Sequence, residues 1–254
     1  MDKYIEEFEF AKQIIEEAYE RIIKKPITNI EIKRDKSLVT NIDIECEKFI
    51  LSKIHDAYPN DNFVSEETNP KNEVKSRTWL LDPLDGTICF IKKFKNWSIQ
   101  LAFVDEDKTQ FSVMYFPDNN ELFTCYRGKG VYLNGKKIEK VPEVDKSQCV
   151  VEYCGREIYK KIDITGKMCS ILKDNVPIQM FLASASGSFC NLITERTNFL
   201  ISTNQNPWDI IPGRLLCEEM GAKFVTTEYG INFYSFCPEI EEIMVNFING
   251  LEKN

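Results

Sequence analysis

The sequence contains a single histidine, His55, among 254 residues. One histidine excludes a zinc site built from several histidines and a His-Glu-x-x-His motif, and a Ser-His-Asp triad would have to be built on His55 itself. His55 falls near the end of a predicted helix, and we expect it on the surface. The enzyme classes that remain are those that work without a histidine base.

Long apolar runs are missing as well. No stretch reaches the roughly 18 apolar residues that cross a bilayer, and the charged residues 1–7 lack the apolar core of a signal peptide. The nine cysteines include no Cys-x-x-Cys pair, which is typical of reduced thiols that serve as small core residues. We therefore expect a cytoplasmic protein that does not contact a membrane.

Positive charge is in deficit. Lysine and arginine number 32 against 40 aspartates and glutamates, which gives a net charge of -8 and a pI of about 5.0. This balance argues against a surface for a nucleic-acid polymer. An anionic substrate would need local positive charge, and bound metal ions are the obvious source.

The pattern of predicted elements changes along the chain. The first part predicts amphipathic helices over residues 3–25 and 40–57, a hairpin-like excursion between them, and then an antiparallel meander. After a polar segment around Pro142, strands and helices alternate, which is typical of a sheet covered by helices on both faces. We therefore predict an N-terminal half, residues 1–142, and a C-terminal half, residues 143–254, in one compact catalytic unit. The second half is expected to hold strands at 148–153, 178–182, 199–202, 223–226 and 231–235 and helices at 157–172, 186–196, 209–220 and 238–252.

The most informative stretch is residues 79–87, Trp-Leu-Leu-Asp-Pro-Leu-Asp-Gly-Thr. Its apolar start predicts a short buried strand that ends at Asp82, because Pro83 cannot donate to a sheet ladder. Two carboxylates, a backbone carbonyl and a hydroxyl then follow within a few residues, which suits a hard cation such as Mg2+. Taken alone, Asp-x-x-Asp-Gly is equally compatible with an acidic turn.

Other acidic residues occupy comparable positions. Glu66 follows a short apolar strand, and Asp209 stands at the start of a predicted helix. Carboxylates at strand ends and helix starts can converge at one edge of a sheet, where four of them would hold two or three ions about 4 Å apart. Simpler alternatives are an acidic turn at Glu66, an N-cap at Asp209 and a capping box at Asp43.

Together these motifs resemble the signature of the inositol monophosphatase family, the Mg2+-dependent, lithium-sensitive phosphatases. The matching segments are residues 64–67, 79–87 and 207–209, with further matches at residues 38–43, 130–135 and 184–186. They follow the order of the family and span most of the chain. The resemblance implies a layered αβαβα sandwich of the sugar-phosphatase type, with α+β and α/β character, and hydrolysis of a phosphomonoester.

The resemblance also implies a metal site with two or three Mg2+ ions. Glu66, Asp82 and the backbone carbonyl of Leu84 would hold one ion. Asp82, Asp85 and Asp209 would hold a second, and a third, weaker ion would lie near Glu66.

Further roles follow from the same resemblance. Thr87 and Asp43 would pair across the site and, together with Glu66, orient or deprotonate the attacking water, so the catalytic set is Glu66, Thr87 and Asp43. Backbone amides would receive the substrate phosphate. The implied substrate-binding residues are Asp85, Gly86, Thr87, Ser184, Ala185, Ser202 and Asp209.

One departure bears on specificity. Family members that prefer inositol phosphates carry a glutamate seven residues before the aspartate of Trp-Asp, where this chain has Ser202. The change removes an acceptor for ring hydroxyls, so we hypothesise broad or non-inositol specificity. Candidate substrates are inositol monophosphate, fructose 1,6-bisphosphate or another sugar phosphate, histidinol phosphate and 3'-phosphoadenosine 5'-phosphate.

One alternative function and one expectation about assembly remain. The alternative is a catalytically silent homologue with a binding or regulatory role. Such a homologue would be expected to have lost a metal carboxylate, and here all of them are present. Members of the family commonly form homodimers, and the aromatic strands around residues 111–126 are a candidate surface for a second copy.

Overall fold

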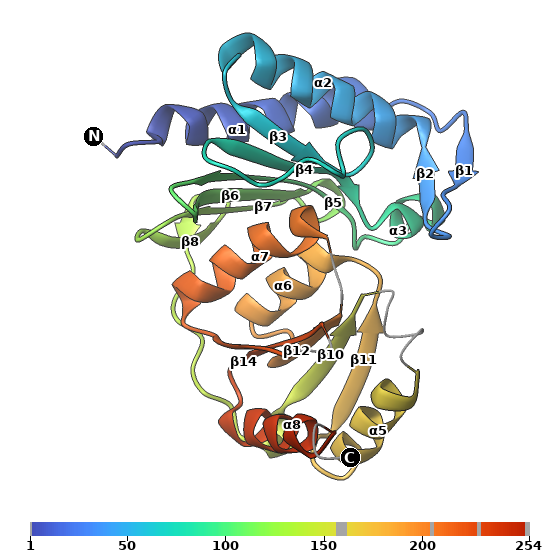
Figure 1. Ribbon diagram of the computed structural model, residues 1–254, viewed down its shortest axis with the longest axis vertical. Coiled ribbons are helices and arrows are strands. Elements are labelled where there is room, and N and C mark those ends of the chain that lie inside the picture. The colour runs from blue at the N-terminus through green and yellow to red at the C-terminus, as the bar shows by residue number, and fades with distance from the viewer. Residues whose placement is uncertain (1, 156–161, 204–205, 228–229, 252–254) are drawn as a thin grey trace.

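Helices and sheets alternate in layers in the computed structural model (Figure 1), which describes residues 2–155, 162–203, 206–227 and 230–251. Two helices cover the outer face of the first sheet, two lie between the sheets, and two cover the far face of the second sheet. The expected αβαβα sandwich is confirmed. In layer order the helices are α1 (Ile5–Ala18) and α2 (Asn41–Ala57), α6 (Ala185–Ile193) and α7 (Pro207–Met220), and α5 (Ile162–Leu172) and α8 (Pro238–Leu251).

The first sheet has seven strands in the order β3-β4-β5-β6-β7-β8-β9. Only β3 and β4 run parallel; the other neighbours are antiparallel, which confirms the meander. The tight turn at Asn134 and Gly135 has positive φ at both residues, as a two-residue hairpin requires. The strands are β3 (Asn62–Ser65), β4 (Thr78–Asp85), β5 (Ser98–Asp105), β6 (Lys108–Phe116), β7 (Glu121–Tyr126), β8 (Gly130–Leu133) and β9 (Lys136–Lys137).

Strand β4 is longer than the sequence predicts. We expected it to end at Asp82, but it continues to Asp85. The register of β4 against β5 shifts between Asp82 and Asp85, so Pro83 falls in a bulge, where the ladder does not need its missing N–H. The two carboxylates therefore leave the sheet at an irregular strand end.

The helices of the outer layer pack on this sheet through the side that faces away from α7. Ile15 of α1 and Ile50 of α2 share a fully buried cluster with Trp79 and Phe103. The predicted helix over 3–25 is confirmed as α1 followed by a π-helical turn at Tyr19–Ile23. The expected excursion before α2 is the hairpin of β1 (Ile30–Ile32) and β2 (Leu38–Thr40), and the short helix α3 (Thr87–Lys92) follows β4.

The second sheet has five strands in the order β11-β10-β12-β14-β13. Strand β10 runs parallel to both neighbours, and β14 runs antiparallel to both of its own. Helices cover both faces, as predicted. Helix α6 ends at Ile193, short of the expected residue 196, and Glu195 takes a positive φ of 60°. The strands are β10 (Val150–Cys154), β11 (Ile178–Leu182), β12 (Phe199–Thr203), β13 (Lys223–Thr226) and β14 (Ile231–Ser235).

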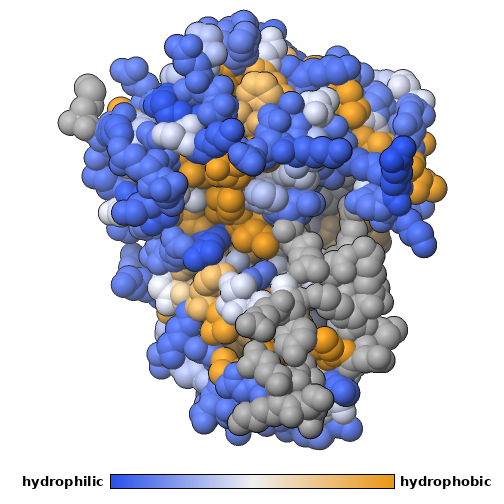
Figure 2. All heavy atoms as spheres, viewed as in Figure 1, coloured by the Kyte–Doolittle hydropathy of each residue, from blue (hydrophilic) through white to orange (hydrophobic). Residues whose placement is uncertain are grey.

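His55 and the cysteines lie where the sequence predicts. His55 is exposed, and all nine cysteines are free thiols, eight of them buried and Cys169 partly so. Residues 157–161 of the predicted helix 157–172 lie outside the described residues, and the boundary at residue 142 stays a prediction. Within the described ranges no helix has the length and apolarity to cross a membrane. Polar residues dominate the face in Figure 2, with hydrophobic side chains gathered in its middle layers.

Most aromatic side chains of the strands around residues 111–126 are buried. Phe111, Phe116 and Phe123 are each at most 3% exposed. They pack in the clusters on the two faces of the seven-stranded sheet. Tyr115 and Tyr126 are only partly buried, and the candidate dimer surface at these strands stays a prediction.

Candidate active site

Three carboxylates meet where β4 ends against the first turn of α7. Oxygen atoms of Asp82, Asp85 and Asp209 all lie within 4.8 Å of one another. Asp82 and Asp85 are buried, and Asp209 is partly buried. The structure thus brings three of the four expected carboxylates together, and Glu66 is not part of this group.

Local chain geometry brings the acidic residues to this edge. Because β3 runs parallel to β4, the chain leaving β3 stays beside β4, and the Glu66 amide donates to the Leu81 carbonyl at 3.3 Å. Asp209 is the third residue of α7, and its Oδ2 accepts from the Asn206 amide at 3.0 Å in a capping box. Asp209 therefore caps its own helix and also joins the carboxylate cluster.

Asp85 lies at the N-terminus of α6. Its carboxylate accepts from the Ser184 hydroxyl at 2.7 Å, from the Ala185 amide at 3.1 Å and from the Ser186 amide at 2.8 Å, and the Ser186 hydroxyl also donates to it. A helix N-terminus favours a negative charge in this position. Ser184 and Ala185 thus bind a carboxylate here, and their predicted contact with a substrate phosphate stays a prediction.

Thr87 and Asp43 pair across the site. The Thr87 hydroxyl lies 3.0 Å from Asp43 Oδ1 and 3.2 Å from the Leu84 carbonyl oxygen, and it donates its one hydrogen toward these acceptors. Asp43 Oδ2 accepts from the Thr40 amide at 2.9 Å and the Thr40 hydroxyl at 2.6 Å, so the predicted capping box also exists. Burial raises the pKa of Asp43 despite these hydrogen bonds.

The turn between β4 and α3 requires glycine at position 86. Gly86 has a φ of 80°, which disfavours a side chain. A Cβ atom there would lie 2.7 Å from the Asn96 carbonyl oxygen and 3.3 Å from Ser184 Cβ. The missing side chain therefore lets the start of α3 approach the start of α6.

Electrostatic crowding is strongest at Asp82. Burial and the neighbouring carboxylates of Glu66, Asp85 and Asp209 raise its pKa well above the usual range. Its Oδ1 accepts from the Leu84 amide at 3.0 Å, which offsets only part of this effect. A divalent cation prefers such oxygen ligands and supplies the missing positive charge, so the residues present fit a metal ion.

A lysine that the sequence analysis missed lies beside the other acidic pair. Lys33 Nζ, from the turn between β1 and β2, lies 2.8 Å from Glu66 Oε1 and 2.6 Å from Glu67 Oε1. Although burial opposes it, these carboxylates raise the pKa of Lys33. Burial and the Glu66 charge raise the pKa of Glu67 to about 8. No sequence signal marks Lys33, because its turn is distant along the chain.

A second missed residue is Glu47 of α2, which is fully buried. Its carboxylate accepts from the Glu67 amide at 2.7 Å and the Thr68 amide at 2.8 Å, and from the Thr68 hydroxyl. Glu47 thereby fixes the chain directly after Glu66. A charged residue next to Cys46 on the apolar face of the helix is the signal that could have revealed it.

The residue that bears on specificity, Ser202, is buried within β12. It stands between Cys154 of β10 and Asn232 of β14 in the sheet register. Its predicted substrate contact stays a prediction.

Comparison with known proteins now decides the family. Residues 3–245 match the profile of the inositol monophosphatase family. The chain belongs to this family. As a member of the inositol monophosphatase family it is a phosphatase, a hydrolase of phosphoric monoesters.

Relatives of this inositol monophosphatase family member carry more than one name. A fructose-1,6-bisphosphatase/inositol-1-monophosphatase of Thermotoga maritima is 30% identical over 77% of this chain and 74% of its own. A Nus factor SuhB of Vibrio cholerae is 31% identical over 75% of this chain and 72% of its own. The substrate therefore does not follow from family membership.

Solved structures agree on the fold. An inositol monophosphatase (IMPase) of Thermotoga maritima superposes with a TM-score of 0.83, at 25% identity and 98% coverage of both chains. An IMPase/NADP phosphatase complexed with Mg2+ and phosphate superposes with a TM-score of 0.75, at 23% identity over 91% of this chain and 90% of that one.

Proposed function

We propose that the protein is a Mg2+-dependent phosphomonoesterase that hydrolyses a small phosphorylated metabolite with a metal-activated water. The observation that carries the proposal is the cluster of Asp82, Asp85 and Asp209, with oxygen atoms within 4.8 Å of one another. The structural relative that is complexed with Mg2+ and phosphate supports the choice of ion. The complete set of carboxylates argues against a catalytically silent homologue.

The residues that would hold the ions follow from the geometry together with the family resemblance. Glu66, Asp82 and the Leu84 carbonyl would hold one ion, and Asp82, Asp85 and Asp209 a second. When bound, the ions would lower the pKa of water and neutralise phosphate charge. A third ion held by Glu66 would compete with the Lys33 ammonium, because Lys33 already pairs with Glu66 Oε1.

We propose that Thr87 orients the nucleophile, which its hydrogen bonds support. Because its hydroxyl hydrogen points toward Asp43 and Leu84, the lone pairs of Thr87 Oγ1 are available to accept a hydrogen bond from water. Asp43 holds the hydroxyl in this orientation and Glu66 would take part in accepting the proton. A water nucleophile leaves no covalent phospho-enzyme.

The substrate class is a small phosphomonoester, and we propose specificity broader than inositol monophosphate. The reason is Ser202, which replaces the family's glutamate acceptor for ring hydroxyls. Fructose 1,6-bisphosphate, histidinol phosphate and 3'-phosphoadenosine 5'-phosphate are the alternatives. Fructose 1,6-bisphosphate gains support from the name of the Thermotoga relative.

A panel of these phosphomonoesters at fixed Mg2+, with and without Li+, tests the proposal. We expect Mg2+-dependent phosphate release from several substrates and inhibition by Li+. Strong turnover of inositol 1-phosphate alone would contradict the broad specificity. No Mg2+-dependent release of p-nitrophenol from p-nitrophenyl phosphate would instead favour a silent homologue.

We also propose a cytoplasmic homodimer that binds no nucleic-acid polymer. The net charge of -8 supports the absence of nucleic-acid binding. Because one relative is named a Nus factor, RNA binding is worth testing directly. Light scattering after size exclusion, and RNA binding by gel shift at stated salt, are the measurements.

A further inference from the structure

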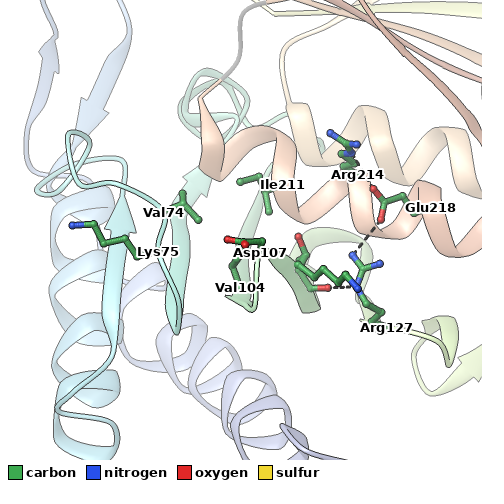
Figure 3. A pocket seen from close by; sticks show the side chains of 10 residues that line it. Val74, Lys75, Val104, Asp107, Arg127, Ile211, Arg214 and Glu218 are labelled. Atoms are coloured by element: carbon green, nitrogen blue, oxygen red, sulfur yellow. Dashed lines mark hydrogen bonds and ion pairs between the residues drawn. The ribbon is translucent and has the colours of Figure 1, made fainter.

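A pocket whose lining includes none of the catalytic carboxylates lies beside α7 (Figure 3). It has a volume of about 440 Å³ and opens between the loop before β4, the turn between β5 and β6, and α7. Such a volume is within the range of small-molecule sites. Asp82 pairs with Gln100 on β5, and the pocket residue Val104 lies four residues further along. At about 3.3 Å per residue, this separates the two sites by about 13 Å.

The floor of the pocket is apolar. Val74, Val104 and Ile211 point toward its centre from three different segments (Figure 3). An apolar floor at this depth suits a ring or another flat apolar group of a ligand.

Positive charge gathers on one wall. Arg127 and Arg214 share the Glu218 carboxylate, at 3.2 Å and 2.9 Å, so two guanidinium groups face one anion. Arg214 is fixed further by stacking on the Phe224 ring at 4.2 Å. Each guanidinium retains N–H groups beyond those that bind Glu218, and such groups match phosphate oxygens.

Two more charged residues complete the lining. Lys108 is exposed and forms no ion pair within the part of the chain that the structure describes. Asp107 lies beside Val104 in the lining of the pocket (Figure 3). A carboxylate in this place can accept hydrogen bonds from sugar hydroxyls. The Lys75 ammonium points away from the pocket and pairs with Glu73.

We propose that this pocket is a second ligand site, which binds a phosphorylated nucleoside or a similar small organic phosphate. Phosphate oxygens bind Arg127, Arg214 and Lys108, the sugar hydroxyls bind Asp107, and the ring lies on the apolar floor. The site needs no metal ion, because its own side chains supply the positive charge.

The pocket also has a packing connection to the catalytic carboxylates. Its residues Val104 and Ile211 share one buried cluster with Val64, Leu80 and Trp208. These three residues precede Glu66, Asp82 and Asp209 by two, two and one positions. An occupant therefore contacts the cluster that supports the metal ligands.

Isothermal titration of ADP in EDTA, at low salt, tests the proposal without relying on hydrolysis or on metal. We expect saturable binding that weakens as salt is raised. Arg214→Gln and Lys108→Gln are each expected to weaken ADP binding about tenfold, since each removes a charge-assisted hydrogen bond. Adenosine and inorganic phosphate, which each carry part of the ligand, are expected to bind more weakly than ADP.

Lys140→Gln is the matched control, because it removes the same charge from an exposed lysine outside the pocket. Equal ADP affinity in Arg214→Gln, Lys108→Gln and the control would overturn the proposal, as would the absence of saturable binding. ADP binding that is absent in EDTA and appears only when Mg2+ is added would place ADP in the catalytic site and also overturn it. None of these outcomes depends on the hydrolytic activity, so a failure here is distinct from a failure of the proposed function.

Discussion

Two buried aspartates on the same strand pair, Asp105 at one end and Asp82 toward the other, are held in opposite ways. Asp105 accepts from the Tyr4 hydroxyl at 2.7 Å, the Arg77 amide at 3.2 Å and the Ser76 hydroxyl. Although burial opposes it, these donors hold the pKa of Asp105 at about 2. Asp82 faces other carboxylates, and burial and those charges raise its pKa.

The difference separates a structural acid from a functional one. The donors around Asp105 come from the N-terminal segment and the loop before β4, so its charge fastens these segments together. Asp82 is surrounded mainly by acceptors, so the protein alone leaves its charge poorly compensated. A bound cation would supply the missing compensation at Asp82, whereas Asp105 already has its donors and the Lys3 ammonium at 3.7 Å.

The largest expected effect is the loss of activity in Asp85→Asn. The variant removes a carboxylate from the metal cluster, and we expect kcat for p-nitrophenyl phosphate with Mg2+ to fall roughly a thousandfold. Asp56→Asn, at an exposed aspartate of α2, is the matched control and should retain activity. Because Asp85 also caps α6, circular dichroism must show a folded variant. A folded Asp85→Asn with normal kcat would remove Asp85 from the site.

Thr87→Ala is expected to lower kcat by roughly a hundredfold or more, because the attacking water loses its orienting hydroxyl. Mg2+ affinity should change little, since Asp82, Asp85 and Asp209 remain. Thr87→Ser keeps the hydroxyl and should recover most of the rate. Steady-state kinetics over a Mg2+ titration separates the two effects, and near-normal kcat in Thr87→Ala would rule out this role.

Mg2+ is expected to stabilise the folded protein, by about 2.7 kcal/mol at a concentration one hundred times its dissociation constant. Differential scanning calorimetry with Mg2+ and with EDTA measures the change in Tm. Asp82→Asn should lose most of this increment. Without Mg2+ it should unfold no more easily than the wild type, because a repelling charge is gone. An unchanged increment in Asp82→Asn would contradict the assignment.

The smallest expected effect is a loss of stability on substitution of Asp105. Asp105→Asn should lower the free energy of unfolding by about 1–3 kcal/mol, since buried donors lose a charged acceptor, and it should keep the full Mg2+ increment. The folded-state pKa of about 2 lies below the unfolded value of about 3.9. The stabilisation is therefore complete above pH 4 and is lost as the pH falls toward 2. Urea unfolding at pH 7 and pH 3 should show the gap between variant and wild type closing at pH 3.

The sequence was sufficient for the layers and for the cluster of Asp82, Asp85 and Asp209, for different reasons. Periodicity predicts elements whose faces are buried, such as α1 and the strands of the meander. The carboxylates were found because their order along the chain resembles a known family. The resemblance predicts contacts between distant segments only for the residues of its motifs, and Lys33 and Glu47 lie outside those motifs, so both were missed.

The end of β4 shows why local rules fail in a particular place. Because proline has no N–H to donate, the sequence predicts that a strand ends before it, and for this reason we expected β4 to end at Asp82. A bulge relaxes that requirement, and whether one forms depends on the neighbouring strand β5. The same limit applies to the pocket beside α7, whose lining comes from segments that the sequence keeps apart.

The position of α7 between the sheets has a consequence for synthesis on the ribosome. The seven-stranded sheet is encoded by residue 137, yet the helix that covers its inner face begins at residue 207. Until that helix emerges, the nascent chain exposes apolar residues such as Leu80, Met114 and Phe123, which are fully buried in the finished fold. A chain paused in this interval would be a ready target for chaperones and for aggregation. It would gain its last metal ligand, Asp209, only when that surface is covered.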